Sequence, residues 1–183
     1  MGAISYVVPK GDLTLSKREA YRKGAMLAGL QFAMSKNIGS SVDLERIRAG
    51  QDPISVDIRD LEPTRDFAAV IDDWQTAPIL LVNGFYTVFN GSVAPILAAN
   101  KGAVFYMVGI ETVPTPVSRI VFRKGGVAAN IIQQFDLERM VNSQEIEGYF
   151  TTPVVYGPTD TLAITVRGRI ATGVLARVQL GGY

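Results

Sequence analysis

The chain has 183 residues, of which 48% are hydrophobic and only 19% are charged, and its formal net charge is +1. Cysteine and histidine are absent, which excludes disulfides and thiolate metal sites and removes the commonest general base and metal ligand. We therefore expect a protein that is not an enzyme and uses no cofactor or metal. The near-neutral charge also predicts no specific nucleic-acid recognition.

Residues 1–50 predict a helical N-terminal extension. Ser16 and Glu19 have the spacing of a capping box, which predicts a helix from Lys17 to about Lys36. A second, short helix is predicted over residues 43–50, with Asp43 as its cap and Gly50 as its terminator.

The first helix is a candidate interface. Its first turns are basic, and its second half is apolar on nearly every side, which is unusual for a helix that covers a single core. We expect it to contact a neighbouring subunit or a membrane surface, although a solvated basic helix end is the simpler alternative. The residues predicted to make these contacts are Arg18, Arg22, Lys23, Met26, Leu27, Leu30, Phe32 and Met34.

Residues 51–183 predict a β domain. The candidate strands lie at 54–61, 66–74, 78–82, 85–89, 102–113, 117–126, 152–156, 160–169 and 173–182. Asn83-Gly84 predicts a hairpin between the third and fourth of these, and a helical insert is expected over 135–147, capped by Asp136. A series of strands without regular β–α alternation favours an antiparallel sandwich or barrel over a parallel sheet, and about eight strands in two facing sheets is a single jelly roll.

Alternation within residues 160–169 predicts which side chains face the core. Leu162, Ile164 and Val166 are expected inside, and Ala163, Thr165, Arg167 and Arg169 outside. The outward positions include no pair of a nucleophile and a base.

Two groups of residues could carry chemistry. The acidic residues of one segment, from which a glycosidase carboxylate pair could come, are Asp57, Asp60, Glu62, Asp66, Asp72 and Asp73. Because arginines are interleaved, surface charges and turn caps explain them better. The turn at 123–126, "RKGG", could cradle a phosphate, but it lacks the spacing of a phosphate-binding loop, and a solvated basic turn is favoured.

Aromatic residues offer a third possibility. A stacking platform for sugars or bases could come from Phe85, Tyr86, Phe89, Phe105 and Tyr106. However, strand neighbours point to opposite faces, so core and interface roles are favoured. Trp74 could bind carbohydrate or anchor the edge of the core.

Four segments of the C-terminal part carry a resemblance to a known family: "PILAANKGAVFYMVGIETV", "VSRIVFRKGG", "GYFTTPVVYGPTDTLAITVRGR" and "GVLARVQLGGY". In the order and residue pattern of these strand segments, the chain resembles a family of small major capsid proteins with a single jelly roll. These proteins come from tailless, icosahedral, membrane-containing double-stranded DNA phages of the sphaerolipovirus type. The resemblance covers roughly residues 52–183 and offers no motif residue. It implies an upright β-sandwich that assembles into capsomers with a larger capsid protein around a lipid vesicle.

The sequence hypothesis is therefore a virion structural protein, a homo-oligomeric capsid subunit whose basic N-terminal helix could meet an internal membrane. The first residues lack the pattern of a signal peptide, so synthesis in the host cytoplasm and residence in the virion are expected. The main alternative is a carbohydrate- or receptor-binding jelly-roll module, such as a virion spike or attachment protein. A carboxylate glycosidase is the third hypothesis.

Overall fold

The computed structural model describes residues 4–36, 41–51, 59–67, 73–91, 102–112, 115–125, 127, 130–157 and 160–182. Within them, nine strands form one curled, mixed sheet in the order β2-β9-β4-β7-β1-β6-β5-β8-β3. The strands are β1 (Ile4–Pro9), β2 (Arg59–Leu61), β3 (Phe85–Asn90), β4 (Ala103–Ile110), β5 (Val117–Lys124), β6 (Ile131–Asp136), β7 (Glu147–Tyr156), β8 (Leu162–Gly168) and β9 (Val178–Gly182).

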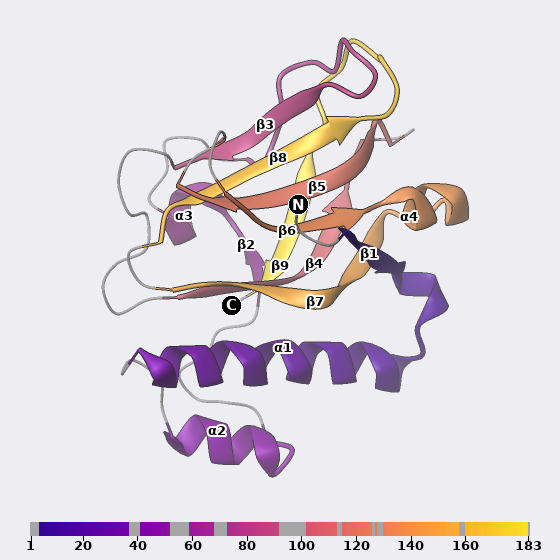
Figure 1. Cartoon of the computed structure of the whole chain (residues 1–183). Coiled ribbons are helices and arrows are strands. Elements are labelled where there is room, and N and C mark those ends of the chain that lie inside the picture. The colour runs from indigo at the N-terminus through magenta and orange to yellow at the C-terminus, as the bar shows by residue number, and fades with distance from the viewer. Residues whose placement is uncertain are drawn as a thin grey trace.

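The curl places β3, β8 and β5 on one side of the core and β4 and β7 on the other (Figure 1). Aromatic rings from both halves meet between them. Phe105 of β4 lies 5.3 Å from Phe122 of β5, and Phe135 of β6 stacks on Phe150 of β7 at 4.2 Å between ring centroids. Leu162, Ile164 and Val166 belong to the same core, which confirms the predicted inward face of β8.

Strand β1 joins the two halves, and the sequence did not predict it. It pairs in parallel with β6 and antiparallel with β7, so the expectation of helices alone in residues 1–50 is wrong for Ile4–Pro9. A short hairpin would force β1 to run antiparallel to the strand it connects to. No such hairpin joins β1 to β6 or β7, so β1 can run parallel to one of them and antiparallel to the other. The sheet is consequently mixed and continuous, and a jelly roll of two separate antiparallel sheets is not confirmed.

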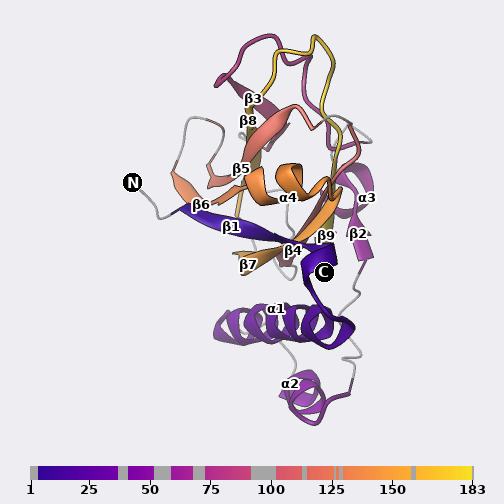
Figure 2. The same ribbon diagram turned by 90° about the vertical axis from the view of Figure 1, so that its right-hand side faces the viewer.

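Two helices form a layer below the sheet. Helix α1 (Leu15–Ser35) lies between the sheet and α2 (Ser41–Arg48), as Figure 2 shows. The predicted capping box is wrong, because α1 begins two residues earlier and its N-cap is Thr14, whose hydroxyl accepts a hydrogen bond from the Lys17 N–H. Gly50 does terminate α2: it has φ +78°, and the Gly50 and Gln51 amides bond back to Ile47 and Arg46.

Several other predicted elements differ from those observed. The segment 78–82 is not a strand: the hydroxyl of Tyr86 accepts hydrogen bonds from the Leu80 and Leu81 amides, and Asn83 turns the chain with φ 65°. The predicted strand 66–74 begins instead in helix α3 (Pro63–Phe67). Strand β6 was missed, and the helical insert shrinks to α4 (Glu138–Ser143), where Asp136 accepts a hydrogen bond from the Glu138 amide.

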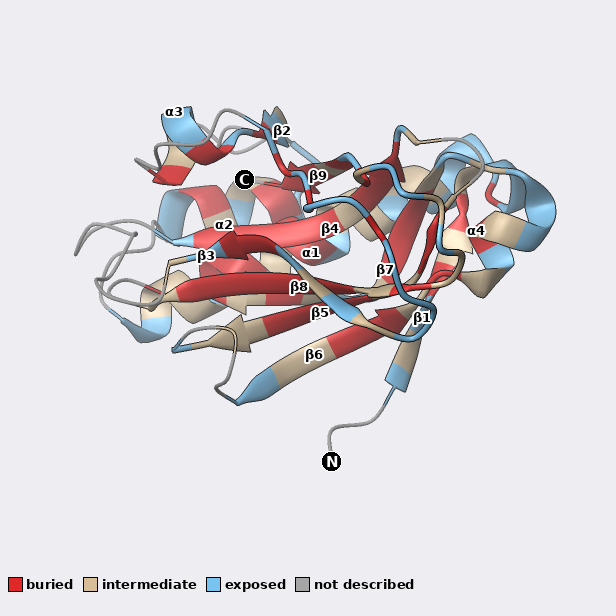
Figure 3. Ribbon diagram, turned by 90° about the horizontal axis from the view of Figure 1, so that it is seen from above, coloured by how far each residue is buried: buried red, intermediate tan, exposed pale blue. Residues whose placement is uncertain are grey.

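Burial follows this architecture. In Figure 3 the buried residues concentrate on the central strands, while α4 and the outer side of α3 carry much of the exposed surface. Ala163 and Thr165 were expected to face outward, yet both are buried even though neither belongs to the main core. Neighbouring side chains on the outer face of β8 therefore shield Ala163 and Thr165 from solvent.

Candidate interaction surfaces

Helix α1 is anchored on the sheet by aromatic contacts. Tyr21 lies 5.8 Å from Tyr149 of β7, and Tyr149 lies 6.2 Å from Tyr106 of β4, measured between ring centroids. Ala25 is buried in the same cluster. Burial raises the pKa of the Tyr106 phenol. This face of α1 therefore belongs to the chain's own core.

The opposite face of α1 packs on α2. Met26 and Leu30 are buried against Ile47, and Leu27 is partly buried beside them. This arrangement explains why the helix is apolar on nearly every side: it is sandwiched between two layers of its own chain. Met26 and Leu30 were predicted to be interface residues; in the described fold α2 covers both side chains, so their contact with a partner stays a prediction.

The remaining predicted interface residues are partly buried and lie on different parts of α1. The Arg18 guanidinium donates to the Leu13 and Lys10 carbonyls at 3.1 and 2.8 Å, and Arg22 forms an ion pair with Glu19 at 2.9 Å. Phe32 lies against Gly157, where an added Cβ would come within 2.6 Å of its ring. Lys23 and Met34 keep part of their surface exposed. The structure does not gather these residues into one patch.

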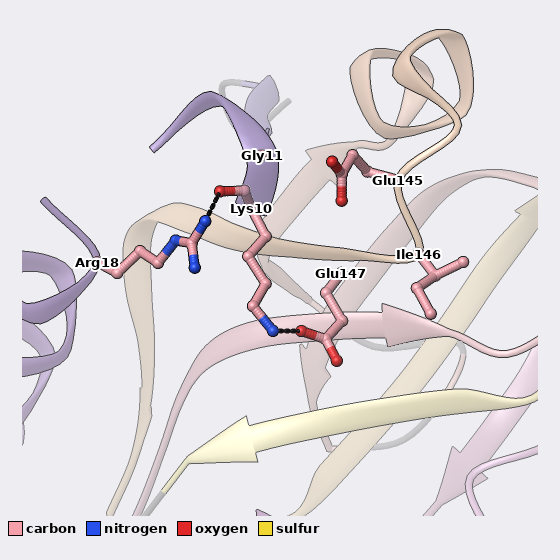
Figure 4. Close-up of a pocket in the computed structure, with 6 residues that line it drawn as sticks. All are labelled: Lys10, Gly11, Arg18, Glu145, Ile146 and Glu147. Carbon is pink, nitrogen blue, oxygen red and sulfur yellow. Dashed lines mark hydrogen bonds and ion pairs between the residues drawn. The ribbon is translucent and has the colours of Figure 1, made fainter. Parts of the chain in front are cut away.

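The connection from β1 to α1 is fixed by charged groups (Figure 4). It runs through a short 3-10 helix, Lys10–Asp12, whose Lys10 ammonium forms an ion pair with Glu147 of β7. A hydrogen bond from Lys10 to Glu147 raises the pKa of Lys10. The carboxylate of Glu145 lies against Gly11, where an added Cβ would sit 3.1 Å from its Cδ. These contacts set the angle at which α1 leaves the sheet.

A groove of about 410 Å³ runs between α1 and the sheet. The helix contributes mostly small side chains together with Lys17 and Tyr21, and the other wall consists of two aromatic residues, a threonine and a proline. Its lining residues are Lys17, Ala20, Tyr21, Gly24, Ala25, Ala28, Tyr106, Phe150, Thr151 and Pro153. The small residues on the helix leave room for apolar side chains of another molecule.

An acidic cleft of about 200 Å³ lies beside β2 and β9. We use this name for the cleft whose carboxylates are Asp60, Glu62, Asp73 and Glu111. Its lining also includes the exposed Arg177. Glu62 forms an ion pair with Arg65 at 3.2 Å, and Glu111 accepts a hydrogen bond from Gln179 at 2.7 Å. Neither Asp60 nor Asp73 has an ion pair within the described ranges.

Among the described residues, Asp66, unlike Asp60 and Asp73, is neutralised by ion pairs with two arginines. It forms ion pairs with Arg59 at 2.5 Å and with Arg65 at 3.2 Å, and the Glu62 amide donates to it at 2.7 Å. Burial alone would raise the pKa of Asp66, but the hydrogen bonds from Arg65, Glu62 and Arg59 outweigh it and hold the pKa below its ordinary value. Asp66 is thus a structural carboxylate. Asp57 and Asp72 lie outside the described residues.

The aromatic residues do not form a platform. Phe89 and Phe105 are in the core, Tyr106 lies under α1 on the other side of β4, and Phe85 is exposed. Trp74 is only 4% exposed, and its indole N–H donates to the Leu61 carbonyl at 2.6 Å. Trp74 therefore anchors the core and offers no face for stacking on a sugar.

The basic turn after β5 also has a structural explanation. Lys124 forms an ion pair with Asp160 at 2.5 Å and lies 5.6 Å from the centroid of the Tyr156 ring. Gly125 has φ +87°, which a glycine tolerates best. Since Asp160 already neutralises the ammonium group, the turn is poorly suited to bind phosphate. Gly126 lies outside the described residues.

The described residues contain no group of three or more potential ligands placed to hold a metal ion. None of the helices among them is both long and apolar enough to cross a membrane. Comparison of the chain with family models, with curated proteins and with solved structures found no match.

Proposed function

We propose that the chain is a non-enzymatic virion structural protein, a capsid subunit with a jelly-roll β domain that self-assembles into the capsomers of an icosahedral shell. Its partners are other copies of itself and a second, larger capsid protein. The α1–α2 layer with its basic residues is the part that we assign to an internal membrane.

The observation that carries this proposal is a nested set of strand pairs. Strand β3 pairs with β8, β4 with β7, and β5 with β6, each of them antiparallel. The chain between β3 and β8 thus folds back on itself as one long hairpin whose turn lies between β5 and β6. A hairpin rolled up so that its successive pairs alternate between two facing layers gives the jelly-roll topology.

The order of strands in the sheet supports this interpretation. The outer pair β3–β8 and the inner pair β5–β6 lie side by side through β5–β8 contacts, while the middle pair β4–β7 lies in the other half of the sheet. Jelly rolls are frequent in viral capsids and in lectins, and fold alone does not decide between them. The carbohydrate-binding alternative relied on Trp74 together with an aromatic face, and the burial of Trp74 makes the capsid role the better supported of the two.

Exposed apolar side chains favour assembly over a free monomer. Leu80, Leu81 and Val82 follow one another in the loop before β3 and are 65%, 67% and 55% exposed. Contiguous exposed apolar surface commonly marks a protein interface. A subunit that packs against copies of itself would remove this surface from water.

Static light scattering of the purified full chain, at several protein and salt concentrations, tests the proposal. We expect a defined multiple of the 19.8 kDa subunit mass that persists on dilution under at least one ionic condition. A monomer under every condition would contradict the proposed function.

A further inference from the structure

The outer face of the sheet half formed by β3, β8, β5 and β6 carries a row of cross-strand neighbours. Arg119 of β5 lies directly opposite Arg167 of β8, Asp136 of β6 pairs with Arg119, and Phe85 of β3 pairs with Arg167. Tyr6 of β1 continues the row beyond Asp136. We call this row, together with Val121, Ala163 and Thr165 beneath it, the arginine face.

Like charges directly opposite each other on one sheet face are unfavourable, and no ion pair to Arg119 or Arg167 within the described ranges compensates them. Arg119 donates to the Gln134 amide oxygen at 3.4 Å, and neither arginine forms an ion pair there. The Asp136 carboxylate instead accepts a hydrogen bond from the Glu138 amide. The two guanidinium groups at the centre of the arginine face therefore have no ion-pair partner within the described residues, although Asp136 lies on the neighbouring strand.

Three buried polar atoms of the arginine face also lack a hydrogen-bond partner. The Nε atoms of Arg119 and Arg167 are buried without a hydrogen bond, and so is the hydroxyl of Thr165, a residue that is only 4% exposed. Arg119 and Arg167 are partly exposed although their Nε atoms are buried, which is typical of arginines whose aliphatic stems lie along an apolar surface. Native proteins leave few such groups unsatisfied.

Exposed aromatic residues frame the row. Phe85 at one end is 58% exposed and Tyr6 at the other is 48% exposed. Arginine, tyrosine and phenylalanine are the residue types enriched at protein interfaces. The α1–α2 layer lies on the opposite half of the sheet (Figure 2), so it does not cover this row.

We propose that the arginine face binds the acidic cleft of a second copy of this chain. The cleft supplies the matching charge: four carboxylates against one arginine, with Asp60 and Asp73 unpaired within the described ranges. The two surfaces are complementary in sign. Carboxylates from a neighbour would reach the guanidinium groups of Arg119 and Arg167 and would relieve their mutual repulsion.

The contact joins two different surfaces. The acidic cleft lies at the β2 edge of the sheet, whereas Arg119 and Arg167 lie near the β3 edge at the other end of the strand order. An interface between unlike surfaces is heterologous, and it forms a closed ring when the rotation between copies closes. The inference deepens the proposed function, on which it rests, by naming the surfaces through which the subunits of a capsomer meet.

Charge reversal tests the contact in the full chain. The face variant is Arg119→Glu with Arg167→Glu, and the cleft variant is Asp60→Arg with Asp73→Arg. Each should weaken self-association at least about tenfold, since each places like charges across the interface. The control, Lys36→Glu with Arg48→Glu, makes the same charge change as the face variant at two exposed positions, the C-cap of α1 and the last residue of α2, and should associate like the wild type.

A mixture of the two variants gives the sharper result. Copies of one variant repel each other, because the face and the cleft then carry charge of the same sign. The acidic face of the face variant matches the basic cleft of the cleft variant, so an equimolar mixture should recover association. Sedimentation velocity measures the association, and circular dichroism checks that each variant is folded. If either reversal unfolds the chain, Arg→Gln and Asp→Asn substitutions at the same positions should weaken association in the same order.

The outcomes separate the two proposals. Association of the wild type that the reversals do not change would overturn this contact and leave the proposed function standing. A wild type that never associates would overturn both. If the face variant associates normally but loses binding to a short double-stranded DNA that the wild type binds, the face serves a polyanion and the contact between copies is wrong.

Discussion

Gly148 of β7 lies so close to Val7 of β1 that an added Cβ would collide with the Val7 side chain and lie 2.9 Å from the Val8 carbonyl oxygen. The first strand is thus locked against β7 where the two halves of the sheet meet. Two strands separated by about three quarters of the chain hold each other in register.

Gly148→Ala should lower the free energy of unfolding by about 1–3 kcal/mol, because the extra methyl group has no space and the neighbouring strands must shift. Gly24→Ala is the control: Gly24 is an exposed residue inside α1 with nothing within 4 Å of an added Cβ, so the change should stabilise by about 0.5–1 kcal/mol. Urea denaturation measures both. Equal effects would show that β1 does not press on Gly148.

Deleting residues 1–9 should abolish cooperative unfolding, since β1 supplies the backbone partners of both β6 and β7. The sequence instead predicted residues 1–50 as a helical extension outside the β domain, which would tolerate such a deletion. Thermal unfolding followed by circular dichroism distinguishes these views. As single-site counterparts, Val7→Asp should unfold the chain and Ile4→Asp should be tolerated, because the first side chain is 0% exposed and the second 53%.

Met26→Ala should cost about 2–5 kcal/mol of stability, because the side chain is fully buried between α1 and α2. At temperatures where the variant is folded, its self-association should equal that of the wild type. Leu15→Ala, at a position that is 80% exposed, should change little. A Met26 variant with unchanged stability and lost association would mean that this residue faces a partner.

Asp66→Asn should reduce stability in a pH-dependent way. The native pKa lies below the ordinary value of 3.8, so the carboxylate stabilises the native state above that value, and the contribution is lost as the pH falls through the native pKa. At neutral pH the variant should be less stable by about 2 kcal/mol, and the difference should vanish in acid. Asp12→Asn, which removes only a 3.7 Å pair with Arg139, should have a smaller effect. A pH-independent loss for Asp66→Asn would contradict the assignment.

Local patterns allowed much of the fold to be predicted. The helical run of α1, the left-handed Gly50 and the alternation of β8 depend on neighbours in sequence, and the structure confirms them. Strand β1 could not be predicted in this way, because its six residues gain their stability from strands more than 120 positions away.

The candidate surfaces show the same limit. Sequence alternation placed Arg167 outward on its own strand and Arg119 on the side opposite Ile120. It could not show that Arg119 and Arg167 face each other, because register between distant strands is set by the whole sheet. The apolar second half of α1 suggested an interface, whereas α2, a helix of the same chain, covers it.

The most direct test of the account is negative-stain electron microscopy of the full chain under the ionic condition that gives the largest assemblies. The account predicts closed particles of uniform size with rotational symmetry, and the loss of these particles in the Arg119→Glu, Arg167→Glu variant. Images that show only monomers or irregular aggregates, under every condition tried, would contradict it.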